Sequence, residues 1–587
     1  MLAKLKLFLK EQKIDFFLLP NSDQFFSEYL PESEKRIQYL TGFNGSNALV
    51  IFGQEKSYFF TDGRYILQAK NQLDLNEFEV FNMAEKPVLS WIADNLTAEK
   101  KLAVDAKLQS VNFIKSCQKN SLNLLFLEQN PVDAIWKNRA NPANSQIFSL
   151  SQEVCGFNFQ AKRKQILQGL KADAMIITKP ENVCWLLNIR AADVEFTPLL
   201  LAQAILFKNG DVDLFVAEQR AQNLVDADLV KVNFIDPEKF QSRILSLKES
   251  CAKIQIDESS TNYWLYQLLQ KNNFEIINKV DPIEIAKACK NHAEISGAIK
   301  AHQADGFALT EFLFWIEKSL AENQEIDEIS AAEKLLELRK KNSHFLYPSF
   351  AAISGFAANG AVIHYHADEK TNKKISANSL YLIDSGAQYF GTDFIATTDV
   401  TRTIAIGKPS AEMIENFTRV LKGHIALARA KFPLGTTGAQ LDVLARNHLW
   451  QAGLNYDHGT GHGVGSFLSV HEGPCGISKR SHQELMEGMI ISNEPGFYKD
   501  GGYGIRIENL MLVEKHNQDF LQFRTLTLAP IDASLIDFKM LTYPEKKWLK
   551  KYHQNLLEIF TPNLEKEQKI WLENLTQKFT NQLGSDY

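Results

Sequence analysis

One glycine-rich stretch constrains this chain more than any other, because it combines backbone freedom with three imidazole side chains. It runs from His458 to Pro474 and reads HGTGHGVGSFLSVHEGP. Glycine lets a backbone turn tightly and approach other atoms closely. Histidine can bind metal or transfer protons near neutral pH. Taken alone, the stretch fits two interpretations: a flexible loop with incidental histidines, or a metal or proton-transfer site.

The stretch belongs to a C-terminal segment in which glycines cluster and short strands alternate apolar and polar residues. A helical pattern with apolar residues at three- and four-residue steps opens this segment near Asn291. The strands that follow include YLIDSGAQYF, TRTIAIG, MIISNEPG and YGIRIENLMLV. Such alternation is typical of antiparallel sheets. Residues 291–587 are therefore predicted to form an α+β domain, with a polar, helix-like tail after Pro562.

The N-terminal half shows one pattern twice. IDFFLLPNSD, followed by IQYLTGFNG, has the shape of ADAMIITKPENVCWLLNIR further along the chain. In each, an Asp precedes a short apolar strand, then a turn, then an aromatic–apolar pair. The polar stretch KNRANPANSQ between them is typical of a linker. We predict two related α/β domains, residues 1–145 and 146–290, with convergence on a common strand–turn pattern as the alternative.

Composition narrows the class of protein. A length of 587 residues suggests three or four domains, and 45% hydrophobic with 23% charged residues is ordinary for a soluble protein. The net charge of -6 gives no reason to expect nucleic-acid or membrane binding. The sequence has no apolar run long enough to predict a membrane-spanning helix. Six scattered cysteines indicate reduced thiols, and MLAKLKLFLKEQK predicts an amphipathic helix and no signal peptide. We expect a cytoplasmic protein.

Acidic residues near the glycine-rich stretch extend the candidate site. Asp384 ends the strand in YLIDSGAQ and Asp399 begins the one in TTDVTRT, so a hairpin would bring them together. Glu494 lies beside the turn in SNEPG. Arg506 and Glu508 share one face of GIRIENL, because successive strand residues alternate sides. Each residue by itself also has an ordinary explanation, as a turn cap or part of a solvated face.

Four neighbouring carboxylates create a charge problem. They would repel one another, and burial would raise their pKa values. Two divalent cations would cancel the four negative charges. One imidazole, that of His462, with four carboxylates is an oxygen-rich ligand set that suits Mn²⁺ best, while Zn²⁺, Co²⁺ and Fe²⁺ stay open. Shared carboxylates would hold the ions roughly 3.5–4 Å apart, as in two-metal hydrolysis.

These motifs together resemble a known family. SFAAISGFAANGAVIHY, YLIDSGAQY, TTDVTRT, HGTGHGVGSFLSVHEGP, NEPGFY and GIRIEN are similar to motifs of the metal-dependent pita-bread peptidases, and among them of the long, three-domain aminopeptidases P (Xaa-Pro aminopeptidases). FTDGRY, CWLLNIR and PIDASLIDFKMLTYPEKKWLKKYH extend the likeness to residues 15–560. The resemblance implies a pita-bread catalytic domain, an antiparallel sheet with covering helices, after the two α/β domains.

The resemblance implies a role for each candidate metal ligand. The positions that match the family's five metal ligands are Asp384, Asp399, His462, Glu494 and Glu508. Asp399 and Glu508 would bind both ions. Asp384 would bind one ion, and His462 with Glu494 the other.

The resemblance also implies residues around the substrate. His364 and His471 match histidines that bind the substrate and move protons, and His458 would line the pocket beyond the cut bond. Tyr498 and Arg506 match positions near the site, where Arg506 would steer a ligand carboxylate.

One segment departs from the family pattern. The hairpin between Asp384 and Asp399 is longer, reading GTDFIATTDV where the family reads GTTDV. An even-numbered extension can preserve which face each strand shows. The wording TDVTRT favours Asp399 as the ligand, and Asp393 in the added piece is the competitor.

The implied activity is that of a metalloprotease, a hydrolase that cuts the first bond of peptides with proline at position two. A metal-bridging hydroxide would attack the carbonyl, because coordination lowers the pKa of water. Glu494 would take a proton, and His364 and His471 would stabilise the intermediate and protonate the leaving nitrogen. The resemblance further implies a homodimer.

Two other functions remain open. One is a prolidase-like dipeptidase, and the other is a non-catalytic pita-bread domain that binds peptides. A serine hydrolase is not supported, because the chain has no G-x-S-x-G. A zincin is not supported either, because His471-Glu472 is not followed by x-x-His.

Overall fold

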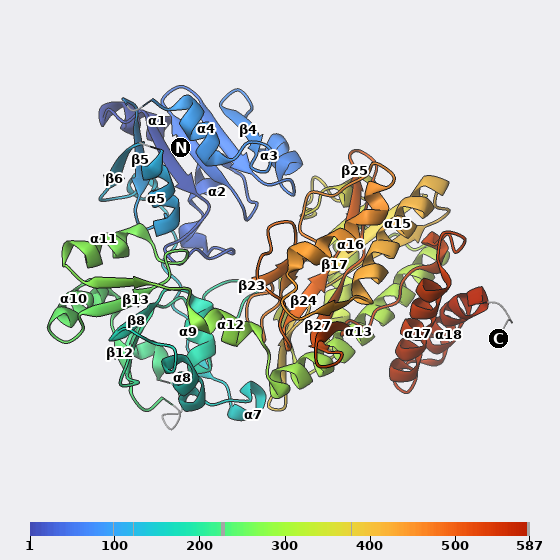
Figure 1. Cartoon of the computed structure of the whole chain (residues 1–587). Coiled ribbons are helices and arrows are strands. Elements are labelled where there is room, and N and C mark those ends of the chain that lie inside the picture. The colour runs from blue at the N-terminus through green and yellow to red at the C-terminus, as the bar shows by residue number, and fades with distance from the viewer. Residues whose placement is uncertain (98, 121, 223, 225–228, 377, 584–587) are drawn as a thin grey trace. The chain divides into compact units, whose positions relative to one another are not determined.

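The structure is a computed structural model of the 587-residue chain, and it describes every residue except 98, 121, 223, 225–228, 377 and 584–587 (Figure 1). The chain divides into two compact units, residues 1–284 and 285–587. All six cysteines are free. Among the described residues, no helix combines the length and the apolar character needed to cross a lipid bilayer.

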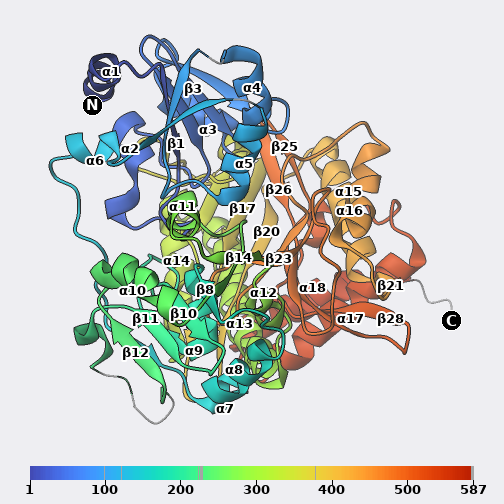
Figure 2. The same cartoon turned by 60° about the vertical axis from the view of Figure 1, so that its left-hand side comes forward.

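The first sheet of the N-terminal unit has the strand order β4-β3-β2-β1-β5-β6. Its central strand β1 (Phe16–Pro20) is antiparallel to β2 and parallel to β5. Alternate residues face opposite sides of a sheet. Phe17 and Val50 pack with helices α1, α2 and α3, whereas Leu18 and Ile51 pack with α4 and α5. In Figure 2, α1 and α2 lie to the left of β1, and α4 and α5 lie to its right. The other elements are α1 (Leu2–Glu11), α2 (Arg36–Thr41), β2 (Leu49–Gly53), β3 (Ser57–Thr61), α3 (Ile66–Gln72), β4 (Phe78–Asn82), α4 (Val88–Asn95), β5 (Lys101–Asp105), α5 (Val111–Lys119), β6 (Asn123–Leu127) and α6 (Pro131–Ile135).

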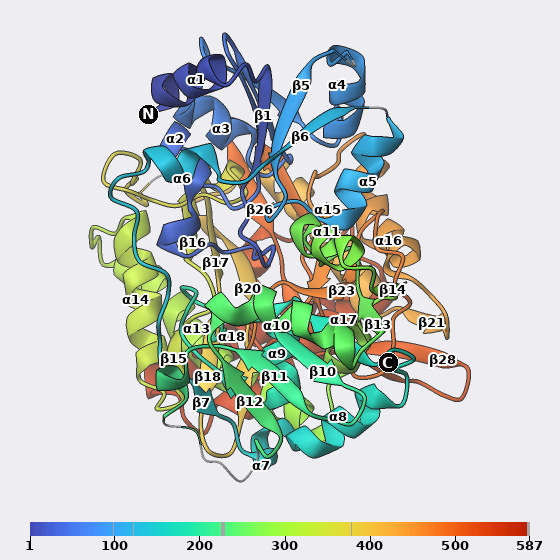
Figure 3. The ribbon, with the colours of Figure 1, turned by 90° about the vertical axis from the view of Figure 1, so that its left-hand side faces the viewer.

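A second sheet repeats this topology, in the order β12-β11-β10-β8-β13-β14. Here β8 (Ala174–Ile177) takes the place of β1, antiparallel to β10 and parallel to β13. The outer strands β12 and β14 run parallel to their neighbours, as β4 and β6 do, and Figure 3 shows β10, β11 and β12 side by side. The shared topology confirms two related α/β folds and the correspondence of IDFFLL with ADAMII. The elements are α7 (Gln152–Cys155), α8 (Phe159–Leu167), α9 (Pro180–Leu187), β10 (Ala204–Phe207), β11 (Val212–Phe215), β12 (Val232–Ile235), α10 (Phe240–Ser246), β13 (Lys253–Ile256), α11 (Tyr263–Lys271), β14 (Glu275–Asn278) and α12 (Pro282–Ala288).

The C-terminal unit is built on antiparallel sheets, as predicted. The larger has the order β21-β28-β27-β24-β22-β23, and a smaller one the order β16-β17-β20. Helix α13 (His292–Ala321) starts at a capping box on Asn291. Helices α13 and α14 pack on the small sheet through Tyr381 and Ile383, and α15 and α16 pack on the large sheet (Figure 1). Helices therefore cover the antiparallel sheets, and the pita-bread prediction is confirmed.

The remaining elements complete this unit, and the predicted polar tail is helix α18. Their bounds are α14 (Glu328–Lys340), β15 (Phe345–Pro348), β16 (Ile353–Phe356), β17 (Ser379–Ser385), β18 (Ala387–Phe390), β19 (Ile395–Thr397), β20 (Val400–Ile406), α15 (Ala411–Ala428), β21 (Lys431–Pro433), α16 (Gly438–Trp450), β22 (Gly461–Gly463), β23 (Glu472–Ile477), β24 (Ile490–Asn493), β25 (Gly496–Lys499), β26 (Tyr503–Arg506), β27 (Asn509–Lys515), β28 (Phe520–Thr525), α17 (Tyr543–Phe560) and α18 (Lys566–Thr580).

Candidate metal centre

The first two candidate ligands lie on a pair of neighbouring strands. β17 and β20 are antiparallel, and their register places Asp384 opposite Thr401. Asp399 directly precedes β20. Ile383 packs with helices α13 and α14, so Asp384 beside it faces the other side of the sheet. The strand pairing therefore brings Asp384 and Asp399 together, as the sequence predicts.

The extra residues between these aspartates form a separate small hairpin of β18 and β19. Asp393 lies at its tip, where its carboxylate accepts from Lys300 Nζ at 3.0 Å and contacts His344 Nε2 at 2.8 Å. Its side chain is 53% exposed, whereas Asp399 is buried. The extension therefore carries Asp393 to the surface and leaves Asp399 facing the other carboxylates.

Glu494 and Glu508 lie where the chain passes from one sheet to another. β24 and β27 pair in the large sheet, whereas β25 and β26 form a separate two-stranded sheet. Glu494 lies between β24 and β25, and Glu508 between β26 and β27. The prediction of one continuous strand through YGIRIENLMLV is therefore wrong, because its two halves pair with different partners. Arg506 and Glu508 still meet at Thr401 Oγ1, which accepts from Arg506 Nε at 3.2 Å and donates to Glu508 Oε2 at 2.7 Å.

The five predicted ligands, together with one further histidine, fall into overlapping groups of ligand atoms that lie within 4.8 Å of one another. The groups are Asp384 with Asp399 and Glu508, His462 with Glu494 and Glu508, and Asp399 with His462 and His471. Glu508 and Asp399 each belong to two groups. This overlap suits a dinuclear centre, since shared carboxylates can hold two cations close together.

His462 presents one ring nitrogen to the carboxylates. Its Nδ1 lies 2.9 Å from the Gly463 carbonyl, which can only accept, so Nδ1 carries the proton. Nε2 then faces Glu494 at 3.3 Å and Asp399 at 3.5 Å. Burial opposes protonation of His462, but its hydrogen bond to Asp399 and the Glu494 charge outweigh burial and raise its pKa to about 9. In the metal-free protein this imidazolium supplies positive charge where a cation would bind.

The carboxylates remain short of positive charge. Burial, partly offset by Arg506 but reinforced by the Asp399 charge, raises the pKa of Asp384 to about 6. Burial raises the pKa of Glu494 and, with neighbouring carboxylates, raises that of Glu508 well above its usual range. Asp384 Oδ1 is also buried without a hydrogen-bond partner among the described residues. An orphaned carboxylate oxygen in an acidic cluster fits a bound cation.

A chain of hydrogen bonds runs from Asp384 towards His458. Arg506 Nη2 donates to Asp384 Oδ2 at 2.7 Å, and Arg506 Nη1 donates to Tyr498 Oη at 2.7 Å. Tyr498 Oη lies 2.9 Å from Nε2 of His458. The other ring nitrogen of His458, Nδ1, contacts the Gly459 carbonyl. Arg506 thus fixes one oxygen of Asp384 and leaves the other facing the cluster.

Comparison with known proteins agrees with this geometry. Residues 297–515 match metallopeptidase family M24 and residues 519–579 the C-terminal region of that family, while residues 1–129 and 138–294 each match a creatinase/prolidase N-terminal domain. Xaa-Pro aminopeptidase 1 from Dictyostelium discoideum is 37% identical over 97% of this chain and 95% of its own length. The chain belongs to the Xaa-Pro aminopeptidase group of metallopeptidase family M24.

Two further relatives of this M24 metallopeptidase support the assignment. A probable Xaa-Pro aminopeptidase P from Coprinopsis cinerea is 36% identical over 98% of this chain and 97% of its own length. The crystal structure of X-prolyl aminopeptidase from Caenorhabditis elegans superimposes with a TM-score of 0.89 at 34% identity, covering 97% of this chain and 95% of that one. That protein is described as a cytosolic enzyme with a di-nuclear active site.

Two hydroxyl groups of the M24 site were missed by the sequence reasoning. Ser492 Oγ donates to Glu494 Oε1 at 2.9 Å and accepts from the His462 amide at 2.9 Å. Thr401 donates to Glu508, as described above. Both lie two residues from a candidate ligand, Ser492 before Glu494 and Thr401 after Asp399. The two-residue periodicity of strands could have identified them.

The glycines of the motif are required by close contact between strands. A Cβ at Gly461 would lie 1.9 Å from the Ser492 carbonyl oxygen, and one at Gly463 would lie 2.2 Å from the Glu472 carbonyl oxygen. Glycine is therefore required at these two positions by the neighbouring strands, and a close approach to metal or substrate stays a prediction. The tight packing of β22 holds His462 beside β24, which leads to Glu494.

His471 lies beside the centre and is followed by a buried ion-pair cluster. Its ring centroid is 4.3 Å from that of His462, at an interplanar angle of 85°. Glu472 Oε1 pairs with Lys290 Nζ at 2.6 Å and Glu472 Oε2 with Lys287 Nζ at 3.1 Å. All three charged side chains are at most 4% exposed. Sequence spacing gave no hint of this cluster, because its lysines lie far from Glu472 in the chain.

His364 lies at the edge of the described cluster. It is half-buried and belongs to none of the three ligand groups. The carbonyl of the preceding residue, Ile363, accepts from Arg506 Nη2 at 3.5 Å. The backbone at His364 therefore approaches the residue that supports Asp384, which is compatible with a role towards substrate.

Proposed function

We propose that this M24 metallopeptidase removes the N-terminal residue from peptides that carry proline at position two, using two divalent cations. The overlapping ligand groups carry the proposal. Ligand atoms of Asp384, Asp399, Glu494 and Glu508 belong to these groups, and the raised pKa values of Asp384 and Glu508 support a local shortage of positive charge. The relatives named Xaa-Pro aminopeptidase support the choice of substrate.

The residues fit two cations in a definite division. Asp384, with its orphaned oxygen, would hold one ion, and His462 Nε2 with Glu494 the other. Asp399 and Glu508 would be shared. Four carboxylates with one imidazole favour Mn²⁺, with Zn²⁺ and Co²⁺ as competitors. When bound, such ions act as Lewis acids and lower the pKa of coordinated water towards neutrality.

The side chains of the protein would handle protons and orientation. Glu494 would accept a proton from the attacking water, and Ser492 would keep its carboxylate in place. His471 would hydrogen-bond the oxygen that becomes negative. His364 would bind substrate and help deliver a proton to the proline nitrogen, since an imidazole titrates near neutrality.

Selectivity for proline would come from the pocket beyond the cut bond. The bond before proline has no N–H, so a site that demands an amide hydrogen would reject it. His458 is held by Tyr498 and by the Gly459 carbonyl, and both Tyr498 and Arg506 are fixed by hydrogen bonds. We assign His458, with Tyr498 and Arg506 behind it, to this pocket.

The proposal extends to the whole protein. We propose three domains, residues 1–145, 146–290 and 291–587, with the first two limiting access to short peptides. We also propose a cytoplasmic homodimer. The description of the Caenorhabditis elegans relative as cytosolic supports the compartment.

A metal add-back assay tests the function. Protein stripped of metal is given Mn²⁺, Zn²⁺ or Co²⁺ singly and assayed on Arg-Pro-Pro and on Arg-Pro. We expect Mn²⁺ to restore cleavage of Arg-Pro-Pro, and Glu508→Gln to abolish it. Turnover of Arg-Pro alone would establish a prolidase-like dipeptidase. Binding of Arg-Pro-Pro without cleavage under every metal would establish a peptide-binding protein.

A further inference from the structure

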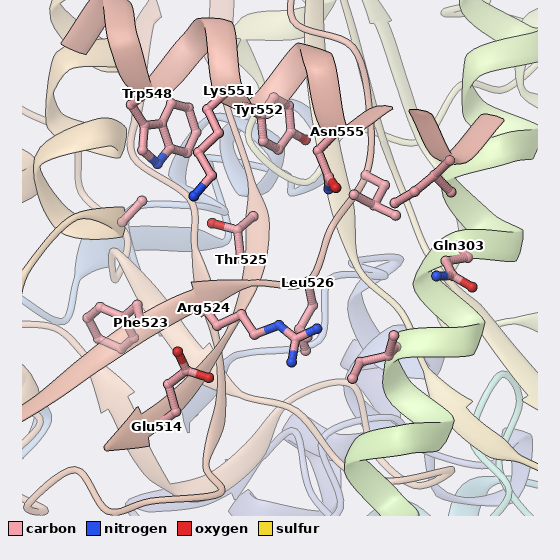
Figure 4. A pocket seen from close by; sticks show the side chains of 14 residues that line it. Gln303, Glu514, Phe523, Arg524, Thr525, Leu526, Trp548, Lys551, Tyr552 and Asn555 are labelled. Atoms are coloured by element: carbon pink, nitrogen blue, oxygen red, sulfur yellow. The ribbon is translucent and has the colours of Figure 1, made fainter. Parts of the chain in front are cut away.

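A second cavity lies in the C-terminal unit and shares no lining residue with the metal centre. Its volume is about 450 Å³, within the range of small-molecule pockets. Helix α13, the end of β28 and helix α17 form its walls (Figure 4). The reaction described above does not use this space.

The lining combines an aromatic wall with two cations that have no side-chain partner in the described part of the chain. Trp548 stacks on Tyr552, with ring centroids 5.2 Å apart and an interplanar angle of 8°. Among the described residues, neither Arg524 nor Lys551 has a side-chain hydrogen bond or ion pair. Figure 4 shows Lys551 reaching from α17 towards the strand that carries Arg524. The carboxylate at the rim, Glu514, accepts a hydrogen bond from Gln522 at 2.9 Å.

The same wall is bonded to the back of the metal centre. Tyr552 Oη accepts from Arg402 Nη2 at 3.0 Å, and Arg402 Nη1 donates to the carbonyls of Glu508 at 2.7 Å and Thr401 at 2.8 Å. Arg402 is 1% exposed, so these bonds are not shared with bulk water. One buried guanidinium therefore joins the cavity wall to the backbone of a candidate metal ligand.

We propose that this cavity binds a small organic anion, whose apolar body lies against Trp548 and whose negative group lies between Arg524 and Lys551. Two cations exceed the single engaged carboxylate at the rim, and a guanidinium with an ammonium is a donor pair suited to a carboxylate or a phosphate. An anion in the cavity would contact Tyr552. Tyr552 is hydrogen-bonded to Arg402, and Arg402 to the backbone carbonyl of Glu508. The anion is thus linked to the affinity of the metal centre.

Binding is tested by calorimetry on the metal-free full-length protein, with benzoate, phenyl phosphate and inorganic phosphate as probes. We expect saturable one-to-one binding of benzoate or phenyl phosphate, and the better probe identifies the anionic group. Arg524→Glu combined with Lys551→Glu should weaken binding at least about tenfold, because both contacts become repulsive. Lys547→Glu, on the same helix but outside the cavity lining, is the matched control and should stay within about twofold.

Several results would overturn the site. These are no saturable binding of either aromatic probe, equal binding to the double variant, or inorganic phosphate binding as tightly as phenyl phosphate. The last would show that the aromatic wall contributes nothing. A circular dichroism spectrum and an unfolding midpoint confirm that the double variant is folded.

The linkage is tested by titrating Mn²⁺ with and without saturating probe. We expect the Mn²⁺ dissociation constant to change at least about threefold, and Mn²⁺ to change the probe's constant by the same factor. Tyr552→Phe keeps the ring but loses the hydrogen bonds of the hydroxyl to Arg402, Ala529 and Thr527, so it should bind the probe and lose the linkage. An unchanged Mn²⁺ constant would refute the linkage. This part rests on the proposed metal centre, whose own failure would appear as absent Mn²⁺ binding alongside intact probe binding.

Discussion

Two buried charge clusters in the C-terminal unit differ in whether the chain supplies the opposite charge. In the Lys287–Glu472–Lys290 cluster, each oxygen of the carboxylate has its own ammonium group, at 3.1 and 2.6 Å. In the metal centre, Asp384 Oδ1 has no partner among the described residues, and the pKa values of Asp384 and Glu508 are raised. Ammonium groups of the chain neutralise the carboxylate of the first cluster, although its Oε2 makes no hydrogen bond among the described residues, whereas the second cluster lacks enough cations of its own.

The difference separates structural charge from functional charge. Ion pairs buried within a protein hold elements in place, and removing one partner leaves an uncompensated charge. Crowded carboxylates without such partners favour protonation or a bound cation. Glu472 is the first residue of β23 and directly follows His471, so its ion pairs with Lys287 and Lys290 fix the chain beside the candidate metal centre. Five experiments test this contrast.

The largest effect is expected from Glu508→Gln in the metal centre. Activity on Arg-Pro-Pro with Mn²⁺ should fall at least about 10⁴-fold, or about 5 kcal/mol, because the two proposed ions would lose the ligand that we assign to both. The metal-free variant should be as stable as the wild type or more stable, since one repelling carboxylate is gone. A urea unfolding curve that shows marked loss of stability in the metal-free variant would contradict the idea of uncompensated charge.

Glu472→Gln, in contrast, should destabilise the protein whether or not metal is present. It leaves two buried ammonium groups without a carboxylate, so we expect a loss of about 3–5 kcal/mol in unfolding free energy with or without metal. Glu487→Gln removes one partner of the exposed Lys515 pair and is the control, with a loss below about 1 kcal/mol. Equal unfolding midpoints for the two variants would refute a structural role for the buried cluster.

The metal-free protein should show the pH signature of Asp384. Its folded pKa of about 6 lies above its ordinary value of 3.8, so it contributes stability below about pH 4 that is lost as pH rises through about 6. The contribution is about 3 kcal/mol. The stability of the wild type relative to Asp384→Asn should therefore decline from pH 4 to 7. Mn²⁺ should remove this decline, because ligation requires the ionised carboxylate. A constant difference across this range would count against a raised pKa.

A smaller effect is expected from Thr401→Val, which removes the hydroxyl that joins Arg506 to Glu508. Metal affinity should fall about 10–100-fold, as is usual for residues that orient ligands. Thr401→Ser keeps the hydroxyl and should remain close to the wild type. Isothermal titration with Mn²⁺ measures both variants, and equal loss in the two would point to packing and not to the hydrogen bond.

The smallest effect is expected from Asp393→Asn at the tip of the extended hairpin. Its ion pair with Lys300 and its contact with His344 are exposed, so kcat/KM should stay within about twofold of wild type. Asp399→Asn should abolish activity under the same assay. A severe loss in Asp393→Asn would reopen the question of which aspartate the metal centre uses.

Most of the candidate site residues could be predicted from strand periodicity and from the sequence motifs. Asp384, Asp399 and Glu494 lie at strand ends as predicted, and the antiparallel pairing of β17 with β20 brings the two aspartates together. The prediction of one strand through Arg506 and Glu508 failed, because local alternation cannot reveal that a chain changes sheets. The extended hairpin also left Asp393 and Asp399 as competitors until the tertiary structure placed one at the surface.

By itself, the sequence determined which residue types alternate along each strand, where glycine permits close contact, and which acidic and imidazole groups gather in the C-terminal unit. Only the tertiary structure decided which charges are neutralised. Lys287 and Lys290 reach Glu472, and Arg402 reaches the Glu508 carbonyl, across separations of more than a hundred residues. Electrostatic energy depends on distance and burial in space, and neither quantity is written in the spacing of residues along a chain.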